Sequence, residues 1–141
     1  MSIRIFYDDV GTRIKSWKAV KKLLEKVIAE EKYIPGDLNF ILTTDKTLRK
    51  INKDFLNHNY NTDVISFRYN TGNVIDGEVY ISSDTVKVNS KNYKVSYGNE
   101  LLRVLIHGTL HLCNYEDTTD LEKMKMREME DYWISLYREE N

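Results

Sequence analysis

The sequence of 141 residues is poor in the features that mark secreted and membrane-spanning proteins. It contains one cysteine, Cys113, so no disulfide can form within the chain. The lack of disulfides is typical of a reducing compartment, and we expect a cytoplasmic protein. No run of about 18 apolar residues occurs, which argues against a membrane-spanning helix. The N-terminal residues lack the basic and then apolar segments of a signal peptide, so we expect no secretion signal.

An excess of positive charge is also missing. Lysine and arginine number 21 against 22 aspartate and glutamate residues, which gives a formal net charge of −1. Proteins that bind nucleic acid through general charge are usually basic, so any RNA contact here must be local. One proline and ten tyrosines argue against disorder. We expect residues 1–141 to form a single domain, which at this length can hold one good core.

Apolar patterns along the chain predict an α+β fold, with a small mixed four-stranded sheet packed with about five helices. Strands are expected at residues 3–7, 37–43, 63–69 and 77–82, the last two as an antiparallel hairpin. Helices are expected at residues 12–28, 45–55, 83–94, 101–112 and 120–137. Pro35-Gly36 is the strongest turn signal in the chain. Thr119 and Glu122 have the spacing of a capping box for the last helix.

Two histidines lie four residues apart in the largely apolar stretch LLRVLIHGTLHLCNYED, residues 101–117. Residues i and i+4 share one face of a helix, about 6 Å apart along its axis, so His107 and His111 can hold one metal ion. The alternative is a pair of core histidines, but burying two imidazoles brings no packing gain over leucine. Gly108 stands where HExxH metalloproteases carry their general base, which argues against a peptidase. Asn114 can end the helix in the left-handed conformation.

Three short motifs resemble those of one known family. Residues 107–117, HGTLHLCNYED, are similar to the HGxLHLxGYDH signature of the YbeY family of metal-dependent, rRNA-processing endoribonucleases. INKDF at 51–55 with TDVISF at 62–67 resembles that family's LNxxYR and PTDVLSF segments, and GEVYIS at 77–82 resembles its GDIxIS. The motifs occur in the family's order, which chance explains poorly.

The resemblance implies the family's architecture, with the metal-bearing helix central and packed on the sheet. It also implies a single-strand-specific endoribonuclease that acts in rRNA maturation and ribosome quality control. The implied partners are single-stranded or ribosomal RNA and the small ribosomal subunit or its assembly factors; we expect neither DNA nor a membrane. The implied cofactor is one divalent metal ion, with zinc first and manganese, iron or nickel as alternatives.

Two departures from the family pattern fall at functional positions. Asp117 stands where the family has its third histidine, and Leu56 stands where it has an arginine. Because a carboxylate can complete a site with two histidines, Asp117 is the expected third ligand, with Glu116 and Asp120 as alternatives. Asp117 can instead cap the last helix. An anionic ligand would make the site harder and more suited to manganese or iron.

Further candidates lie around the metal face. Arg103, one turn before His107, can contact a scissile phosphate, or it can pair with Glu100 three residues earlier. Other residues are expected to bind substrate or to have structural or merely exposed roles: Thr62, Asp63, Ser66 and His58. Cys113 is two residues from His111 and points away from the metal face, so we expect it in the core.

The lysines at 15, 18, 22 and 26 share one face of the first predicted helix, as a solvated surface or as a track for RNA phosphates. The leading interpretation of the whole chain is a metal-dependent endoribonuclease, with either water or a ribose 2′-OH as nucleophile. The alternative is a catalytically weak ribosome-assembly or RNA-binding factor that retains the metal site. A closed structural zinc site needs four protein ligands, which the histidine face does not offer, and this favours the enzyme.

Overall fold

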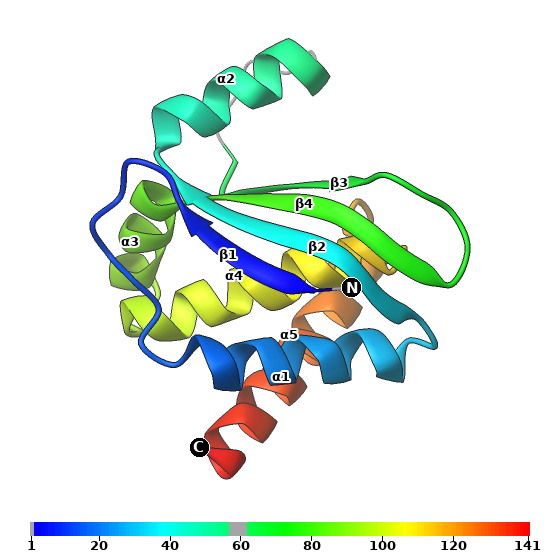
Figure 1. Cartoon of the computed structure of the whole chain (residues 1–141). Helices are drawn as coiled ribbons and strands as arrows, with labels where there is room; N and C mark the ends of the chain where they lie inside the picture. The colour runs from blue at the N-terminus through cyan, green and yellow to red at the C-terminus, as the bar shows by residue number, and fades with distance from the viewer. Residues whose placement is uncertain (1, 57–61) are drawn as a thin grey trace.

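The computed structural model describes residues 2–56 and 62–141 of the chain. Within these residues, four strands and five helices confirm the predicted α+β fold. In chain order they are β1 (Ile3–Tyr7), α1 (Trp17–Glu30), β2 (Ile34–Thr43), α2 (Asp45–Leu56), β3 (Val64–Arg68), β4 (Val74–Ser82), α3 (Ser83–Asn92), α4 (Tyr97–Leu112) and α5 (Asp120–Glu140) (Figure 1). None of the helices in the described ranges has the length and apolar content needed to cross a bilayer.

The sheet is mixed, as predicted, with the strand order β1-β2-β4-β3. β1, β2 and β4 run parallel, and β3 pairs antiparallel with β4. Figure 1 shows α1 and α4 on one side of the sheet and α2 on the other. The alternation of strand side chains agrees with this, because Ser66 bonds to α4 while Phe67 lies in edge contact with Phe55 of α2.

Helix α4, which carries both histidines, lies at the centre of the core, as predicted. It is apolar nearly all round, and a helix of that kind must be covered on most sides. Its buried apolar side chains are Leu101, Leu102, Val104, Leu105, Ile106, Leu110 and Leu112. The sheet, α1, α3 and α5 all contact α4. The backbone that presents the histidines is therefore fixed by packing on several sides.

Gly108 allows α4 to lie unusually close to the sheet. A Cβ atom at this position would come within 2.7 Å of Val79 Cγ1 and 3.2 Å of Val64 Cγ2. The carbonyl oxygen of Gly108 also accepts a hydrogen bond of 3.0 Å from the Ser66 hydroxyl. Position 108 thus faces the sheet with no room for a side chain, so the general-base glutamate of a peptidase could not be placed there.

Two predictions of local structure were wrong. Pro35 and Gly36 lie inside β2, at a register irregularity, rather than in a turn. Ile34 donates its amide to the Asn73 carbonyl on the β4 side, so the next residue, Pro35, faces the β1 side. Proline is tolerated there because the pairing of β1 with β2 begins only at Leu38, and no donor is needed at position 35. The first helix begins at Trp17 and not near residue 12. The preceding segment is held by packing and by a hydrogen bond of 2.9 Å from the Ile14 amide to the Tyr7 hydroxyl.

Candidate metal centre

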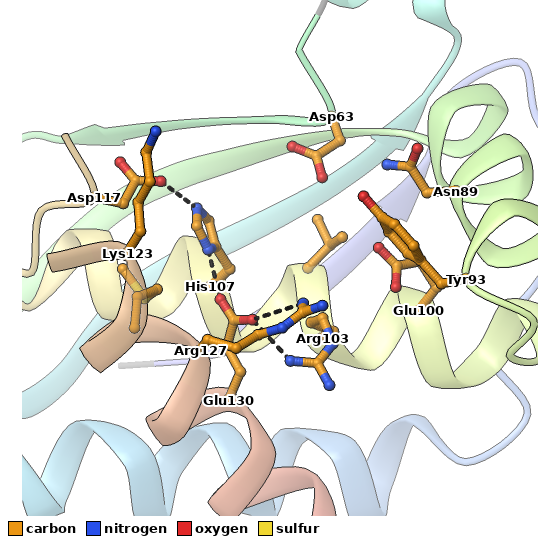
Figure 2. Close-up of a pocket in the computed structure, with 12 residues that line it drawn as sticks. Asp63, Asn89, Tyr93, Glu100, Arg103, His107, Asp117, Lys123, Arg127 and Glu130 are labelled. Carbon is orange, nitrogen blue, oxygen red and sulfur yellow. Dashed lines mark hydrogen bonds and ion pairs between the residues drawn. The ribbon is translucent and has the colours of Figure 1, made fainter. Parts of the chain in front are cut away.

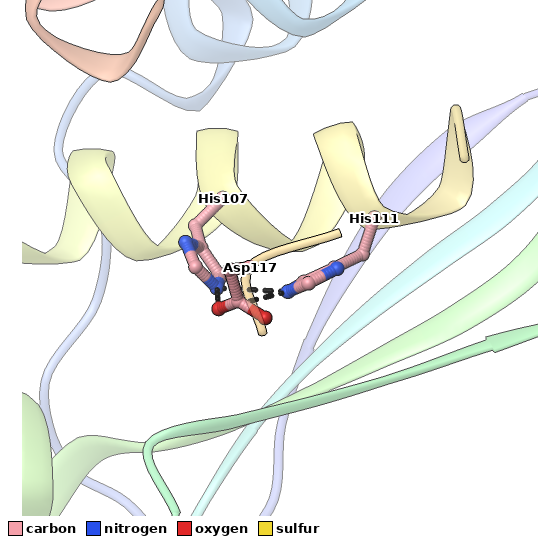
Figure 3. A group of neighbouring side chains, drawn as sticks. All are labelled: His107, His111 and Asp117. Carbon is pink, nitrogen blue, oxygen red and sulfur yellow. Dashed lines mark hydrogen bonds and ion pairs between the residues drawn. The ribbon is translucent and has the colours of Figure 1, made fainter. Parts of the chain in front are cut away.

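His107, His111 and Asp117 converge on one point beside α4 (Figure 3). The Nε2 atoms of the two histidines are 2.9 Å apart. Asp117 Oδ2 lies 3.2 Å from Nε2 of His107 and 3.5 Å from Nε2 of His111. One ligand atom from each residue lies within 4.8 Å of the other two, a separation at which one ion can touch all three. All three side chains are half-buried.

The C-terminus of α4 folds the chain back so that Asp117 reaches the histidines. Asn114 adopts a left-handed conformation with φ of 72°, as predicted. Its amide donates to the His111 carbonyl, and the Tyr115 amide donates to the Leu110 carbonyl, at 3.1 and 3.0 Å. This pair of bonds is the Schellman motif, which ends a helix and reverses the chain. The returning segment then passes over the face that carries the histidines.

The same returning segment is fixed at its far end. Thr119 caps α5, and its side chain and that of Glu122 form the predicted capping box. The Tyr115 hydroxyl donates a hydrogen bond of 2.7 Å to Glu31 at the end of α1. Asp117 is therefore held between two fixed helix termini. Its carboxylate makes the contacts with the histidines, whereas Thr119 occupies the cap position of α5 that was the alternative role for Asp117.

Hydrogen bonds at the far side of each imidazole determine which nitrogen faces the site. His107 Nδ1 lies 2.6 Å from Glu130 Oε2, and His111 Nδ1 lies 2.9 Å from the Tyr115 carbonyl oxygen. A carbonyl and an ionised carboxylate only accept, so each Nδ1 carries the proton. In a neutral ring, Nε2 then presents its lone pair to the centre.

The donor set fits a divalent metal ion. The two Nε2 atoms and the Asp117 carboxylate oxygen converge across 2.9 to 3.5 Å, and with both imidazoles neutral their lone pairs face one another, an arrangement that a cation between them stabilises. Two imidazoles and one carboxylate are also a known set of catalytic zinc ligands, one that leaves a coordination position open. The alternative of two isolated core histidines bonded to backbone does not fit, because only His111 bonds to a carbonyl.

Two cavities meet at this centre. The larger, of about 610 Å³, lies along β3 and the end of α4, and Leu56, Thr62, Ser66 and Arg68 are among its lining residues. The smaller, of about 220 Å³, lies between α4, α5 and the C-terminal end of α3 (Figure 2). Both are lined by Asp63, His107 and Asp117, so these three residues mark the boundary between the cavities.

The charges around His107 and Asp63 act on each other. Burial lowers the pKa of the His107 imidazole, but the hydrogen bond and charge of Glu130, with the charges of Asp117 and Asp63, outweigh it and raise that pKa. Burial likewise raises the pKa of Asp63; the nearby His107 opposes this, while Glu130 and Asp117 add to it. The site is thus rich in negative charge, which favours a bound cation.

The other residues predicted for the site are placed as follows. Thr62, Asp63 and Ser66 line the larger cavity, although the Thr62 hydroxyl already bonds to the Val64 carbonyl. Arg103 lines the smaller cavity and makes ion pairs with Glu130 and Asp131 of α5, at 2.9 and 2.7 Å.

Three further predictions concern neighbouring residues. Among the described residues, the group able to share an ion includes neither Glu116 nor Asp120. His58 lies outside the described residues. Cys113 is buried in the core, as predicted, and burial raises the pKa of its thiol to about 12.

Sequence reasoning missed Glu130. This carboxylate is buried on α5 and binds both His107 and Arg103, which lie more than twenty residues earlier in the chain. A signal was present, because Glu130 falls on the buried face of α5 with Met126, Trp133 and Ile134. A charged residue on an apolar helix face needs a partner, and that expectation would have drawn attention to it.

Comparisons with known proteins agree with this geometry. The family model of Endoribonuclease YbeY matches residues 7–138. An Endoribonuclease YbeY of Flavobacterium johnsoniae is 43% identical over 117 residues, which cover 83% of this chain and 84% of that protein. The Endoribonuclease YbeY of Flavobacterium psychrophilum is 42% identical over 132 residues, 94% of each chain.

A solved structure is similar as well. The solution structure of TM1509 from Thermotoga maritima superposes with a TM-score of 0.65 at 29% identity, covering 99% of this chain and 91% of that one. The family model spans nearly the whole chain, and the relatives match at high identity over most of their own length. This chain therefore belongs to the YbeY family of endoribonucleases.

Proposed function

We propose that this chain is a metal-dependent endoribonuclease that cleaves single-stranded RNA during rRNA maturation and ribosome quality control. The observation that carries the proposal is the convergence of two imidazole nitrogens and a carboxylate oxygen where two cavities meet. The family relatives bear the name endoribonuclease, which is consistent with that chemistry.

His107, His111 and Asp117 would hold one divalent ion, with zinc first and manganese, iron or nickel as alternatives. When bound, such an ion supplies a Lewis acid for a phosphoryl oxygen. The Nδ1 hydrogen bonds of the two histidines keep their Nε2 lone pairs directed at the site. The half-buried ligands would leave one side of the ion open to substrate.

The substrate would lie across the boundary between the two cavities. Asp63 borders both of them, while Thr62 and Ser66 line the larger one, and we propose these three residues as substrate contacts together with His58. Lys123 and Arg127 line the smaller cavity and supply local positive charge that suits RNA phosphates in a chain of nearly neutral net charge. No general charge attraction is needed for such local contacts.

We further propose that residues 1–141 act as one metallohydrolase domain in the cytoplasm, on ribosomal RNA of the small subunit or its assembly intermediates. One buried core cluster that includes residues from Ile3 to Ile134 supports a single domain. The single buried cysteine supports a reducing compartment. Neither DNA nor a membrane is proposed as a partner.

The test compares cleavage of a labelled single-stranded RNA with cleavage of the same RNA in a perfect duplex. The zinc-loaded and manganese-loaded proteins are expected to cut the single strand and to spare the duplex. Chelation with EDTA should stop cleavage, and added metal should restore it. Stoichiometric metal without cleavage of any RNA would contradict the proposal and favour a ribosome-assembly or RNA-binding factor, which the family comparisons do not favour.

A further inference from the structure

Glu130 is the one buried carboxylate that touches a proposed metal ligand among the residues that the structure describes. Its Oε2 lies 2.6 Å from His107 Nδ1, and its Oε1 accepts a hydrogen bond of 2.9 Å from Arg103. Figure 2 shows Glu130 between His107 and Arg103, and Arg103 in turn donates to Asp131 at 2.7 Å. The four side chains form a continuous chain of hydrogen bonds from Asp131 to the metal centre.

We propose that Glu130 is a positioning residue that fixes the tautomer and orientation of His107, and that Arg103 acts through Glu130. The inference rests on the proposed metal site. Arg103 would then contribute to the site by holding Glu130 in place. This differs from the direct phosphate contact that the sequence suggested for Arg103, and the ion pairs at both terminal guanidinium nitrogens favour it.

The position of the proton on His107 decides whether its Nε2 can bind an ion. If the proton were on Nε2, that nitrogen would have no lone pair to give to an ion. The lone pair of Nδ1 would also face the lone pairs of the Glu130 carboxylate, which is repulsive. The bond of 2.6 Å therefore selects the Nδ1–H form of His107. A carboxylate behind an imidazole also makes the opposite nitrogen a stronger ligand.

Arg103 supplies the second partner of the buried Glu130 carboxylate. A buried charge is costly unless it is paired, and each Glu130 oxygen has a separate donor. Burial lowers the pKa of Arg103, but the hydrogen bonds and charges of Asp131 and Glu130 raise it overall, so its cation is secure.

The two histidines are supported unequally. His107 has an anionic partner in Glu130, whereas His111 has the neutral carbonyl of Tyr115. The carbonyl cannot be removed by substitution, but the carboxylate can be made neutral with almost no change in shape. The contribution of Glu130 is therefore accessible to experiment.

The test uses Glu130→Gln, with Glu128→Gln as the matched control, because Glu128 lies on the same helix and is exposed. Zinc affinity is measured by competition with a chromophoric chelator, and thermal stability is measured in the metal-free proteins. Glu130→Gln is expected to lose about 10–100-fold in zinc affinity, the usual effect of losing an outer partner of a ligand. Glu128→Gln should match the parent. Equal zinc affinity in a folded Glu130→Gln protein would overturn the proposal.

A second measurement needs no variant. Nitrogen NMR of the zinc-loaded parent, with ¹⁵N-labelled histidine, reports which nitrogen of each ring carries a proton. A proton on Nδ1 of His107, slow to exchange, is expected, and zinc bound through Nδ1 would overturn the proposal even if Glu130→Gln fails to fold.

Neither readout depends on RNA cleavage. If the parent binds zinc with the expected tautomer but cuts no RNA, the endoribonuclease proposal fails while the role of Glu130 stands. If the parent cuts RNA and Glu130→Gln keeps its zinc affinity, the proposed role of Glu130 fails while the endoribonuclease proposal stands. If Glu130 only ties α4 to α5, Glu130→Gln should lower thermal stability while the zinc affinity of the folded variant stays unchanged.

Discussion

Replacing Gly108 with alanine tests the close contact between α4 and the sheet. A methyl group at this position would lie 2.7 Å from Val79 Cγ1, inside the van der Waals distance, and 3.3 Å from the Ser66 hydroxyl. Val79 is fully buried and β-branched, so its side chain cannot rotate away cheaply. The helix or the strand must therefore move.

The magnitude follows from two opposing contributions. Alanine in place of glycine inside a helix stabilises by about 1 kcal/mol. Forcing an extra methyl group into a well-packed core costs about 1–3 kcal/mol, and here it also weakens the bond from Ser66 to the Gly108 carbonyl. The net expectation is a loss of roughly 0–2 kcal/mol, which lowers the thermal midpoint by up to about 10 °C for a protein of this size.

Gly98→Ala is the matched control, because Gly98 lies in the same helix and a methyl group there meets nothing within 4 Å. Unfolding is followed by circular dichroism in EDTA, so that bound metal does not contribute to stability. Gly98→Ala should be neutral or slightly stabilising. A Gly108→Ala protein as stable as Gly98→Ala would refute the argument that packing against Val79 requires glycine.

Three further predictions can be checked with standard assays. Asp117→Asn should weaken zinc binding by more than about 10–100-fold, the loss that follows removal of a residue that only supports a ligand, because a neutral amide replaces an anionic ligand. Unchanged affinity in a chelator competition would remove Asp117 from the ligand set. Replacing single lysines of the row from Lys15 to Lys26 should leave turnover at saturating RNA unchanged and flatten the dependence of log affinity on log salt by at most about 0.7 each. Cys113, with a pKa of about 12 and a buried thiol, should react with a thiol reagent only after denaturation; rapid reaction of the native protein would contradict its place in the core.

Local sequence signals predicted much of the fold. The capping box at Thr119 and Glu122, the left-handed Asn114 and the apolar periodicity of α4 each depend on neighbours within a few residues. The histidine pair was predictable for the same reason, because its spacing alone places both rings on one helix face. These features need no knowledge of tertiary contacts.

The remaining features depend on contacts between distant segments. Pro35 reads as a turn residue, and only the late start of the pairing between β1 and β2 makes it acceptable inside a strand. The partners of Arg103 were expected nearby at Glu100, yet packing of α5 on α4 brings Glu130 and Asp131 instead. The role of Glu130 was hidden for that reason. Sequence spacing along one helix says nothing about which second helix will lie beside it.

We propose that His107 and His111, with Asp117, hold one divalent metal ion. Metal analysis of freshly purified protein tests it most directly, in the parent, in His107→Ala and in His111→Ala. His58→Ala is the control, since it makes the same chemical change outside the proposed ligand set. One ion per chain is expected in the parent and in His58→Ala, and none in either of the other two variants, all of them folded. Metal content equal to that of the parent in both His107→Ala and His111→Ala would contradict the claim.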